Sequence, residues 1–322
     1  MKPSTCALLL GLACVASGCS SPVPRTQLPS GASALPRSLR VGVSEAGRIE
    51  VHVVPLERYV QAASLSEFAP ASEHTHTAQR MLEVQAVIGR TYAISHMGRH
   101  ARDGYDLCDR THCQLFEPGR LTTSRWAPQA AAASRDTRSE VLWFDGAPAL
   151  AVFHADCGGS TSAAADVWGG TLRPYLVSRP DDGAAGDAHA PWRYENSRSA
   201  VHAALNADPR TRVGTRLDGI EILDRDAAGR AARVRLHGTN ARVVRGAALR
   251  EVLAGAFGAR SLRSTWFAVS QERGRFVFQG RGFGHGVGLC QAGALARIRA
   301  GASPGAVLQR YFPGTKLVKL PG

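Results

Sequence analysis

The chain has 322 residues and a formal net charge of +13 at pH 7. This length allows one large domain or two, and folding would bury roughly three quarters of the unfolded surface. The positive charge is almost all arginine without a clustered basic run, which favours an anionic polymer or a membrane surface over nucleic acid. A genome-wide preference for arginine over lysine also explains much of the charge.

The first residues are typical of an export signal. Lys2 precedes an apolar run, residues 7–16, that is too short to span a bilayer, and small residues then lead to Cys19. We expect removal of residues 1–18 and lipidation of Cys19, which would anchor the protein to a membrane facing the periplasm or cell wall. Cleavage of an ordinary signal is the alternative. Ser20 after Cys19 favours the outer membrane if the host has one, and residues 19–38 read as a flexible tether.

The first elements of the folded part are a hairpin and two helices. Alternating runs at residues 39–43 and 49–54 flank a glycine turn and predict a β-hairpin. Helical spacing then runs from Leu56 to Glu67 and stops before Pro70, so Glu67 lies where a helix gives way to a loop. The strongest helical pattern covers residues 77–97.

A polar loop from His100 to Gln114 contains two histidines and two cysteines. Four cysteines remain after the signal, and in an oxidising compartment these form two disulfides or bind metal. Soft thiolates together with imidazole suit a tetrahedral Zn²⁺. Zinc binding and a Cys108–Cys113 disulfide therefore both remain open for this loop.

The second half of the chain reads as mostly β-structure. Residues 141–144 and 149–154 predict a hairpin around Asp145-Gly146, followed by a loop at 166–170 and a short strand at 174–177. Residues 180–208 are polar and irregular, and a β-rich subdomain is expected over about 210–278. Its strands are expected at 220–223, 232–237, 241–244, 265–269 and 275–278, with a helix at 246–256. A helix from about Ala292 ends at Gly301, and Ser303-Pro304 is typical of a helix start.

Every second residue from Gly280 to Gly288 is glycine. In an extended conformation one face of this segment carries no side chains, so another molecule or another backbone can approach closely. The alternative is a barrel corner or bulge that needs glycine for its geometry. The spacing fits neither a dinucleotide fingerprint nor a phosphate loop, and no organic cofactor is expected.

Four groups of motifs share one family pattern. They are Pro55–Tyr59 with Ser66–Pro70, Gln85–Tyr92, the His154…Cys157-Gly-Gly turn with Val167-Trp168, and Gly282–Gln291 with Tyr311–Gly314. Over residues 39–318 the sequence resembles the stage II sporulation protein D and amidase-enhancer family. The resemblance implies an α+β fold, rich in β-structure, with a few helices lining a glycan-binding groove. It also implies a lytic transglycosylase that cuts peptide-free peptidoglycan strands between N-acetylmuramic acid and N-acetylglucosamine, leaving 1,6-anhydro ends.

The resemblance assigns roles to individual residues. Glu67 matches the catalytic glutamate, and one carboxylate suffices because the sugar's own C6 hydroxyl takes the place of water. A zinc site of one histidine and two cysteines matches His100, Cys108 and Cys113, with His112 as an alternative to His100. Residues expected to line the groove are Arg90, Tyr92, His154, Gly284, His285, Gly286 and Gln291.

Two other functions compete with this interpretation. A non-catalytic module could bind peptidoglycan and present it to a cell-wall amidase. A zinc hydrolase that cuts an amide is the other, although the sequence lacks the H-E-x-x-H pattern of such enzymes.

Overall fold

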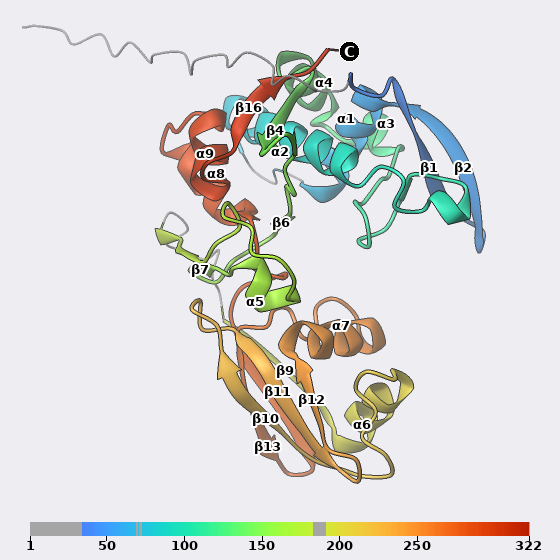
Figure 1. The fold of residues 1–322 in the computed structure, drawn as a ribbon, viewed down its shortest axis with the longest axis vertical. Coiled ribbons are helices and arrows are strands. Elements are labelled where there is room, and N and C mark those ends of the chain that lie inside the picture. The colour runs from blue at the N-terminus through green and yellow to red at the C-terminus, as the bar shows by residue number, and fades with distance from the viewer. Residues whose placement is uncertain (1–33, 69, 71–72, 183–190, 322) are drawn as a thin grey trace, which may run out of the picture.

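The computed structural model describes residues 34–68, 70, 73–182 and 191–321 (Figure 1). The predicted signal, Cys19 and most of the tether lie outside the described residues. The fold is α+β, as predicted, with helices and several small sheets in two lobes. Among the described residues, no helix has the length and apolar character that crossing a membrane requires.

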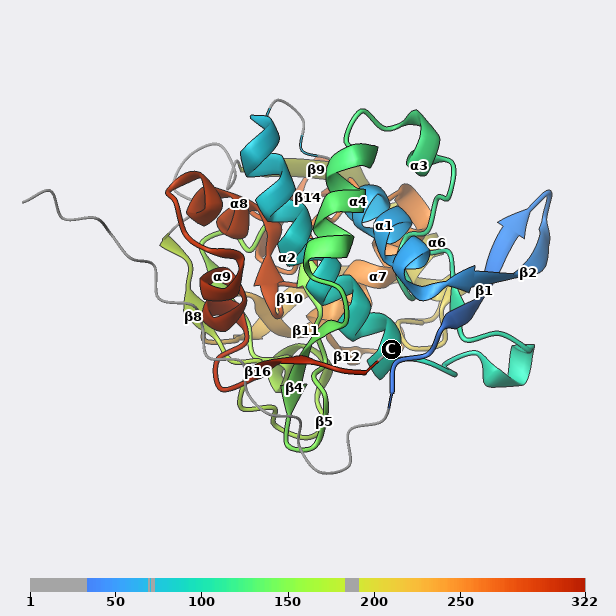
Figure 2. The same ribbon diagram turned by 90° about the horizontal axis from the view of Figure 1, so that it is seen from above.

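The first lobe is built around three helices, α1 (Leu56–Glu67), α2 (Thr75–Ser95) and α4 (Ala127–Asp136), which pack against one another (Figure 2). The predicted hairpin forms as β1 (Ser38–Glu45) and β2 (Arg48–Pro55), and β3 (Leu107–Cys108) pairs in parallel with β1. α1 follows β2 without a gap because Pro55 cannot continue the strand ladder as a donor. A 3-10 turn (Ala101–Asp103) and α3 (Arg120–Thr123) lie in the connecting loops.

The chain returns to this lobe at its C-terminal end. β16 (Lys316–Lys319) pairs with β4 (Glu140–Phe144), which also pairs with β5 (Ala147–Pro148). The hairpin predicted at residues 141–154 is therefore shorter than expected. Its second strand was expected to reach residue 154, but β6 (Phe153–His154) pairs in parallel with β15 (Leu289–Cys290) instead. α8 (Gln291–Arg299) and α9 (Pro304–Tyr311) follow, and the Ser303 hydroxyl caps α9 by accepting a hydrogen bond from the backbone N–H of Ala306.

The second lobe combines two three-stranded sheets with two helices (Figure 1). One sheet contains β10 (Leu217–Arg225), β11 (Ala231–Gly238) and β12 (Arg242–Arg245), and the other contains β13 (Phe267–Glu272), β14 (Arg275–Gly280) and β9 (Trp192–Ser197). α6 (Arg198–Ala207) and α7 (Gly246–Phe257) pack with them around a core that includes Leu236, Phe267, Phe276 and Phe278.

Three expectations for the chain entering this lobe are wrong. Residues 192–207 form β9 and α6 rather than irregular structure, so the lobe begins earlier than the predicted subdomain. Residues 174–177 form no strand, and the expected loop at 166–170 contains the end of α5 (Ala164–Trp168). Two short strands, β7 (Ser160–Thr161) and β8 (Arg179–Pro180), lie with α5 between the lobes (Figure 1).

Candidate active site

Glu67 is the last residue of α1, as the sequence predicts. Its side chain is partly buried, with the buried Leu65 and the partly buried Phe68 beside it in the chain. One carboxylate oxygen, Oε1, accepts a hydrogen bond of 2.6 Å from the backbone N–H of Leu115. The described residues give Glu67 no cationic partner.

Burial raises the pKa of Glu67 to about 7, and the Leu115 N–H partly offsets this rise. Removal from water disfavours the charged form of a carboxyl, whereas a donor to the carboxylate favours it. A carboxyl with a pKa near neutrality can donate a proton and later take one back under ordinary conditions. The geometry of this site therefore suits a general acid and base.

Gln291 connects the glycine-rich motif to this carboxyl. Its side-chain amide Nε2 donates to the backbone carbonyl of Glu67 at 3.2 Å and to Oε1 of Gln85 at 3.3 Å. Gln85 is fully buried, and Gln291 is almost so. The structure therefore places Gln291 behind the catalytic candidate, where it holds the end of α1.

Arg90 does not lie in a groove, contrary to our expectation. Its side chain has no exposed surface, and its guanidinium makes a bidentate pair with Glu57, with distances of 2.6 and 2.9 Å. The carbonyl of Glu140 accepts a further hydrogen bond from it. All of these partners belong to the protein, so Arg90 ties α2 to α1 and β4.

Tyr92 is buried and stacks on His96, with 4.0 Å between the ring centroids. Its hydroxyl accepts a hydrogen bond from Arg99, and burial raises its pKa to about 12. We expected Tyr92 to line the groove, whereas these contacts are those of a residue that packs the end of α2.

The glycine-rich segment from Gly280 to Gly288 is not an extended strand with a bare face. Gly282, Gly284, Gly286 and Gly288 all have positive φ, between 70° and 109°. A Cβ on Gly284 would lie 2.7 Å from the Cβ of His154, and one on Gly286 would lie 2.4 Å from Nε of Arg230. The missing side chains thus leave room for the protein's own atoms, and the geometric alternative explains the glycine pattern.

His154 and His285 come together at this segment, with ring centroids 5.4 Å apart, and Trp168 lies 5.1 Å from His285. His154 is buried, and His285 is partly exposed. Burial and the nearby guanidinium groups of Arg250 and Arg230 lower the pKa of His285 to about 3, so both rings are neutral at physiological pH. No hydrogen bond between the described residues joins either ring to Glu67.

The loop after α2 brings together all four of its candidate ligands. One ligand atom each from His100, Cys108, His112 and Cys113 lie within 4.8 Å of one another. Nδ1 of His112 lies 3.8 Å from both sulfur atoms, and Nδ1 of His100 contacts Asp103 at 3.0 Å. Two thiols and two imidazoles match the donor set of a closed structural zinc site. Both His100 and His112 are therefore placed to bind a metal ion, whereas the sequence left a choice between the two.

Sequence reasoning missed two parts of the site. The backbone N–H of Leu115 carries no side-chain signal, and its contact with Glu67 depends on how the preceding loop folds. Arg230 is fully buried beneath the glycine-rich segment, and it lies in the predicted β-rich subdomain, where we named no candidate site residue.

Two family models match separate segments of the chain. Residues 44–144 match the family model described as Stage II sporulation protein, and residues 184–288 match a model described as a domain of unknown function. Over 280 residues the chain is 25% identical to an amidase enhancer of Bacillus subtilis (strain 168), an alignment covering 73% of this chain and 37% of that protein. The chain thus spans little more than a third of the amidase enhancer.

Two further relatives are aligned over more of their length. Stage II sporulation protein D of Bacillus subtilis (strain 168) is 24% identical over 282 residues, covering 83% of this chain and 75% of the relative. Stage II sporulation protein D of Bacillus amyloliquefaciens is 25% identical over 288 residues, with the same coverage.

Proposed function

We propose that this chain, which belongs to the stage II sporulation protein D and amidase-enhancer family, is a lytic transglycosylase acting on peptide-free peptidoglycan strands. The observation that supports this most is Glu67, a carboxyl at a helix end whose pKa burial raises to about 7. The bond cut would lie between N-acetylmuramic acid and N-acetylglucosamine.

One carboxyl can perform both proton transfers of this reaction. Protonated Glu67 donates its proton to the glycosidic oxygen, and the bond from that oxygen to the muramic acid C1 breaks. The resulting carboxylate then removes the proton from the C6 hydroxyl of the same muramic acid, whose oxygen bonds to C1 and closes the 1,6-anhydro ring. No water is consumed, and Glu67 ends the cycle protonated as it began.

The cysteine and histidine loop supports Glu67 from outside the reaction. His100, Cys108, His112 and Cys113 would hold a Zn²⁺ with four protein ligands, which leaves no open position for a water nucleophile. Bound there, zinc would supply cross-linking of the loop rather than Lewis-acid chemistry. The loop leads directly to Leu115, whose N–H binds the carboxylate.

The test is mass spectrometry of the products formed from peptide-free and peptide-bearing glycan strands. The protein should release fragments one water lighter than hydrolysis products from the peptide-free strands, and Glu67→Gln should release none. Glu117→Gln is the matched control, since Glu117 is an exposed carboxyl of the neighbouring loop paired with Arg120. Hydrated reducing ends would disprove the transglycosylase.

The similarity to an amidase enhancer favours a second candidate function, enhancement of a cell-wall amidase. β2 is an edge strand, and Ile49, Val51 and Val53 on one of its faces are between 48% and 70% exposed. Such a surface suits a protein partner. If Val53→Glu abolished amidase stimulation while Glu67→Gln left it intact and no cleavage were detected, the enhancer function would replace the enzyme.

We also propose that the protein is exported and anchored by a lipid on Cys19. The predicted export signal and the proposed peptidoglycan substrate both imply a location outside the cytoplasmic membrane. Mass spectrometry of the purified protein's N-terminal peptide would reveal the diacylglyceryl cysteine, and an unmodified new N-terminus would indicate an ordinary signal instead.

A further inference from the structure

A second cluster of soft ligands lies at the junction of the lobes, away from the loop. His154, at the end of β6, and Cys157, in the turn after it, meet Cys290, at the end of β15. One ligand atom from each residue lies within 4.8 Å of the other two, and all three side chains are buried. Parallel pairing of β6 with β15 places His154 beside Cys290.

We propose that His154, Cys157 and Cys290 form a buried zinc site that joins the two lobes' connecting segments. This site is separate from the loop of His100 to Cys113, and it does not depend on the proposed enzymatic function.

The first support is the orientation of His154. Its Nδ1 lies 3.1 Å from the carbonyl oxygen of Val287, so Nδ1 carries the proton and Nε2 holds a free lone pair. Nε2 is buried and has no hydrogen-bond partner in the described part of the chain. Metal-binding histidines are held in this way, with one nitrogen donating to a carbonyl and the other on the ion. A zinc ion would satisfy the buried Nε2.

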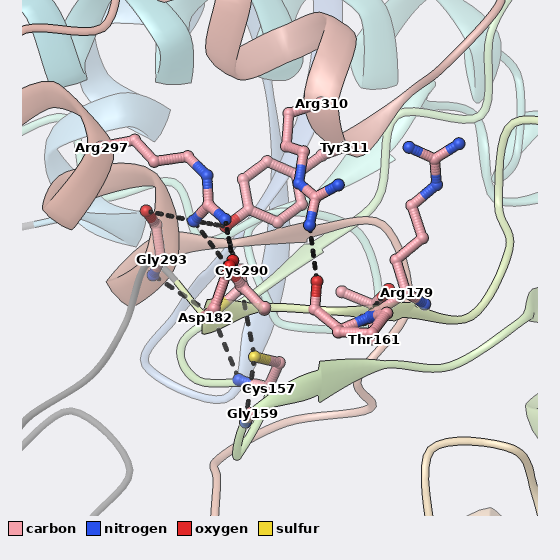
Figure 3. A network of polar contacts seen from close by, with 12 residues as sticks. Cys157, Gly159, Thr161, Arg179, Asp182, Cys290, Gly293, Arg297, Arg310 and Tyr311 are labelled. Carbon is pink, nitrogen blue, oxygen red and sulfur yellow. Dashed lines mark hydrogen bonds and ion pairs between the residues drawn. The ribbon is translucent and has the colours of Figure 1, made fainter.

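The second support is the set of backbone donors on the two sulfurs. Sγ of Cys290 accepts from the N–H groups of Cys157 and Gly293, at 3.2 and 3.3 Å, at the start of α8. Sγ of Cys157 accepts from the N–H of Gly159 at 3.3 Å. Backbone donors and a helix N-terminus stabilise the thiolate, which is the form that binds metal. Figure 3 shows these bonds converging on the two cysteines.

Cys157 also contacts one carboxylate and one guanidinium. In the metal-free protein the Cys157 thiol donates to Oδ2 of Asp181 at 3.4 Å, and Arg297 and the Tyr311 hydroxyl also donate to this carboxylate, at 2.6 and 2.7 Å. Zinc would replace the proton of the thiol, and the carboxylate would keep its donors Arg297 and Tyr311. The Arg230 guanidinium donates a hydrogen bond to the Cys157 carbonyl, so a positive charge lies close to this cysteine. Two thiolates neutralise the divalent ion, so Arg230 faces an uncharged centre.

Zinc binds cysteine as the thiolate, so the ion would displace the proton of each thiol that carries one. Two zinc–sulfur bonds and one zinc–nitrogen bond would form, the latter to the free lone pair on Nε2 of His154.

The experiment compares zinc content per chain, by mass spectrometry of the acid-digested protein, between the full chain and its Cys290→Ser variant. We expect Cys290→Ser and His154→Ala each to remove one zinc per chain. The same loss should occur in a Cys108→Ser, Cys113→Ser background, where the loop lacks its thiols. His202→Ala is the matched control, because His202 is a partly buried histidine of the other lobe that contacts Gly214.

Two results would overturn the site. One is zinc content that does not change on Cys290→Ser in either background. The other is a Cys157–Cys290 disulfide found by peptide mapping of protein purified with a thiol reductant. Cobalt substitution gives an independent readout, since the sulfur-to-cobalt absorption of the loop-deficient background should disappear with Cys290→Ser. Circular dichroism of each variant confirms that the loss of metal does not reflect loss of the fold.

Discussion

The amide of Gln291 holds the backbone carbonyl of Glu67 at 3.2 Å, across 224 positions of sequence. This bond joins the end of α1 to the start of α8, and Gln85 of α2 receives the same amide. Three helices thus meet behind one carboxyl. The position of Glu67 depends on a residue that belongs to the glycine-rich motif and that makes no contact with the carboxylate itself.

Replacing Gln291 should therefore slow cleavage without changing the shape of its pH profile. We expect Gln291→Ala to lower kcat by about tenfold, with KM for the glycan unchanged, because misplacing a catalytic group reduces rate rather than binding. Gln309→Ala, which removes an amide bonded to the Thr315 carbonyl, is the control. An increase in KM at constant kcat would show that Gln291 binds the substrate directly.

The pH dependence of cleavage should follow the ionisation of Glu67. Its pKa of about 7 means that the carboxyl is protonated, and able to act as the acid, below neutrality. The rate should therefore fall about tenfold per pH unit above pH 7. Initial rates on peptide-free strands between pH 5 and pH 9 would test this, and a rate that rises through pH 7 would contradict the assignment.

The same ionisation should affect stability. The folded protein binds the Glu67 proton more tightly than the unfolded chain does, so the stability that this gives is complete below pH 4.5 and is lost as pH rises through about 7. At alkaline pH the ionisation of Glu67 lowers the free energy of unfolding by about 3 kcal/mol. Urea unfolding should show that Glu67→Gln, which carries no charge, gains stability relative to the native protein at pH 8 but not at pH 4. Equal shifts at both pH values would exclude ionisation as the cause.

Disrupting the loop should move the pH profile in a known direction. Cys113→Ser weakens the group of ligands that precedes Leu115, whose N–H lowers the pKa of Glu67. We expect the alkaline limb of the cleavage profile to move to higher pH, together with a lower Tm. Arg102→Ala, at an exposed position of the same loop, should leave the profile unchanged. A lower Tm with an unchanged pH profile would show that the loop contributes to stability but does not influence the pKa of Glu67.

The glycine-rich segment gives a prediction about packing. Gly284→Ala should destabilise the fold by about 2 to 3 kcal/mol, because φ is +109° and the new Cβ would lie 2.7 Å from that of His154. Gly301→Ala has a similar φ of +89° with nothing within 4 Å of the new Cβ, so it should cost only about 1 kcal/mol. Urea midpoints of the two variants measure the difference. Equal losses would mean that the contact with His154 carries no cost.

Local patterns in the sequence predicted much of this fold. The end of α1 at Glu67, the β1–β2 hairpin and the cap of α9 all depend on neighbouring residues, and all are confirmed. Long-range pairing was the part that the sequence did not reveal. β6 leaves its expected hairpin for β15, and β9 is a polar segment that becomes a strand only because β14 accepts it.

The candidate site divides in the same way. Glu67 could be found from its motif and its place at a helix end, whereas its hydrogen-bond donor, Leu115, could not. The family resemblance suggested a groove role for Arg90, and nothing in the sequence shows that Glu57 lies opposite it. Alternating glycines suggest a flat strand only when their φ values are assumed negative, and four of them are positive.

The pairing of Trp192 with Gly280 indicates that the second lobe could be deleted as a unit. The chain enters the second lobe at one of these residues and leaves it at the other, so the whole lobe is an insertion whose two ends are neighbours. A short linker could replace it without stretching the rest of the chain. Such a deletion would also remove Arg230, which packs against Gly286, and would leave that space unfilled. The second lobe is therefore both an insertion that a linker could replace and a source of packing for the glycine-rich segment.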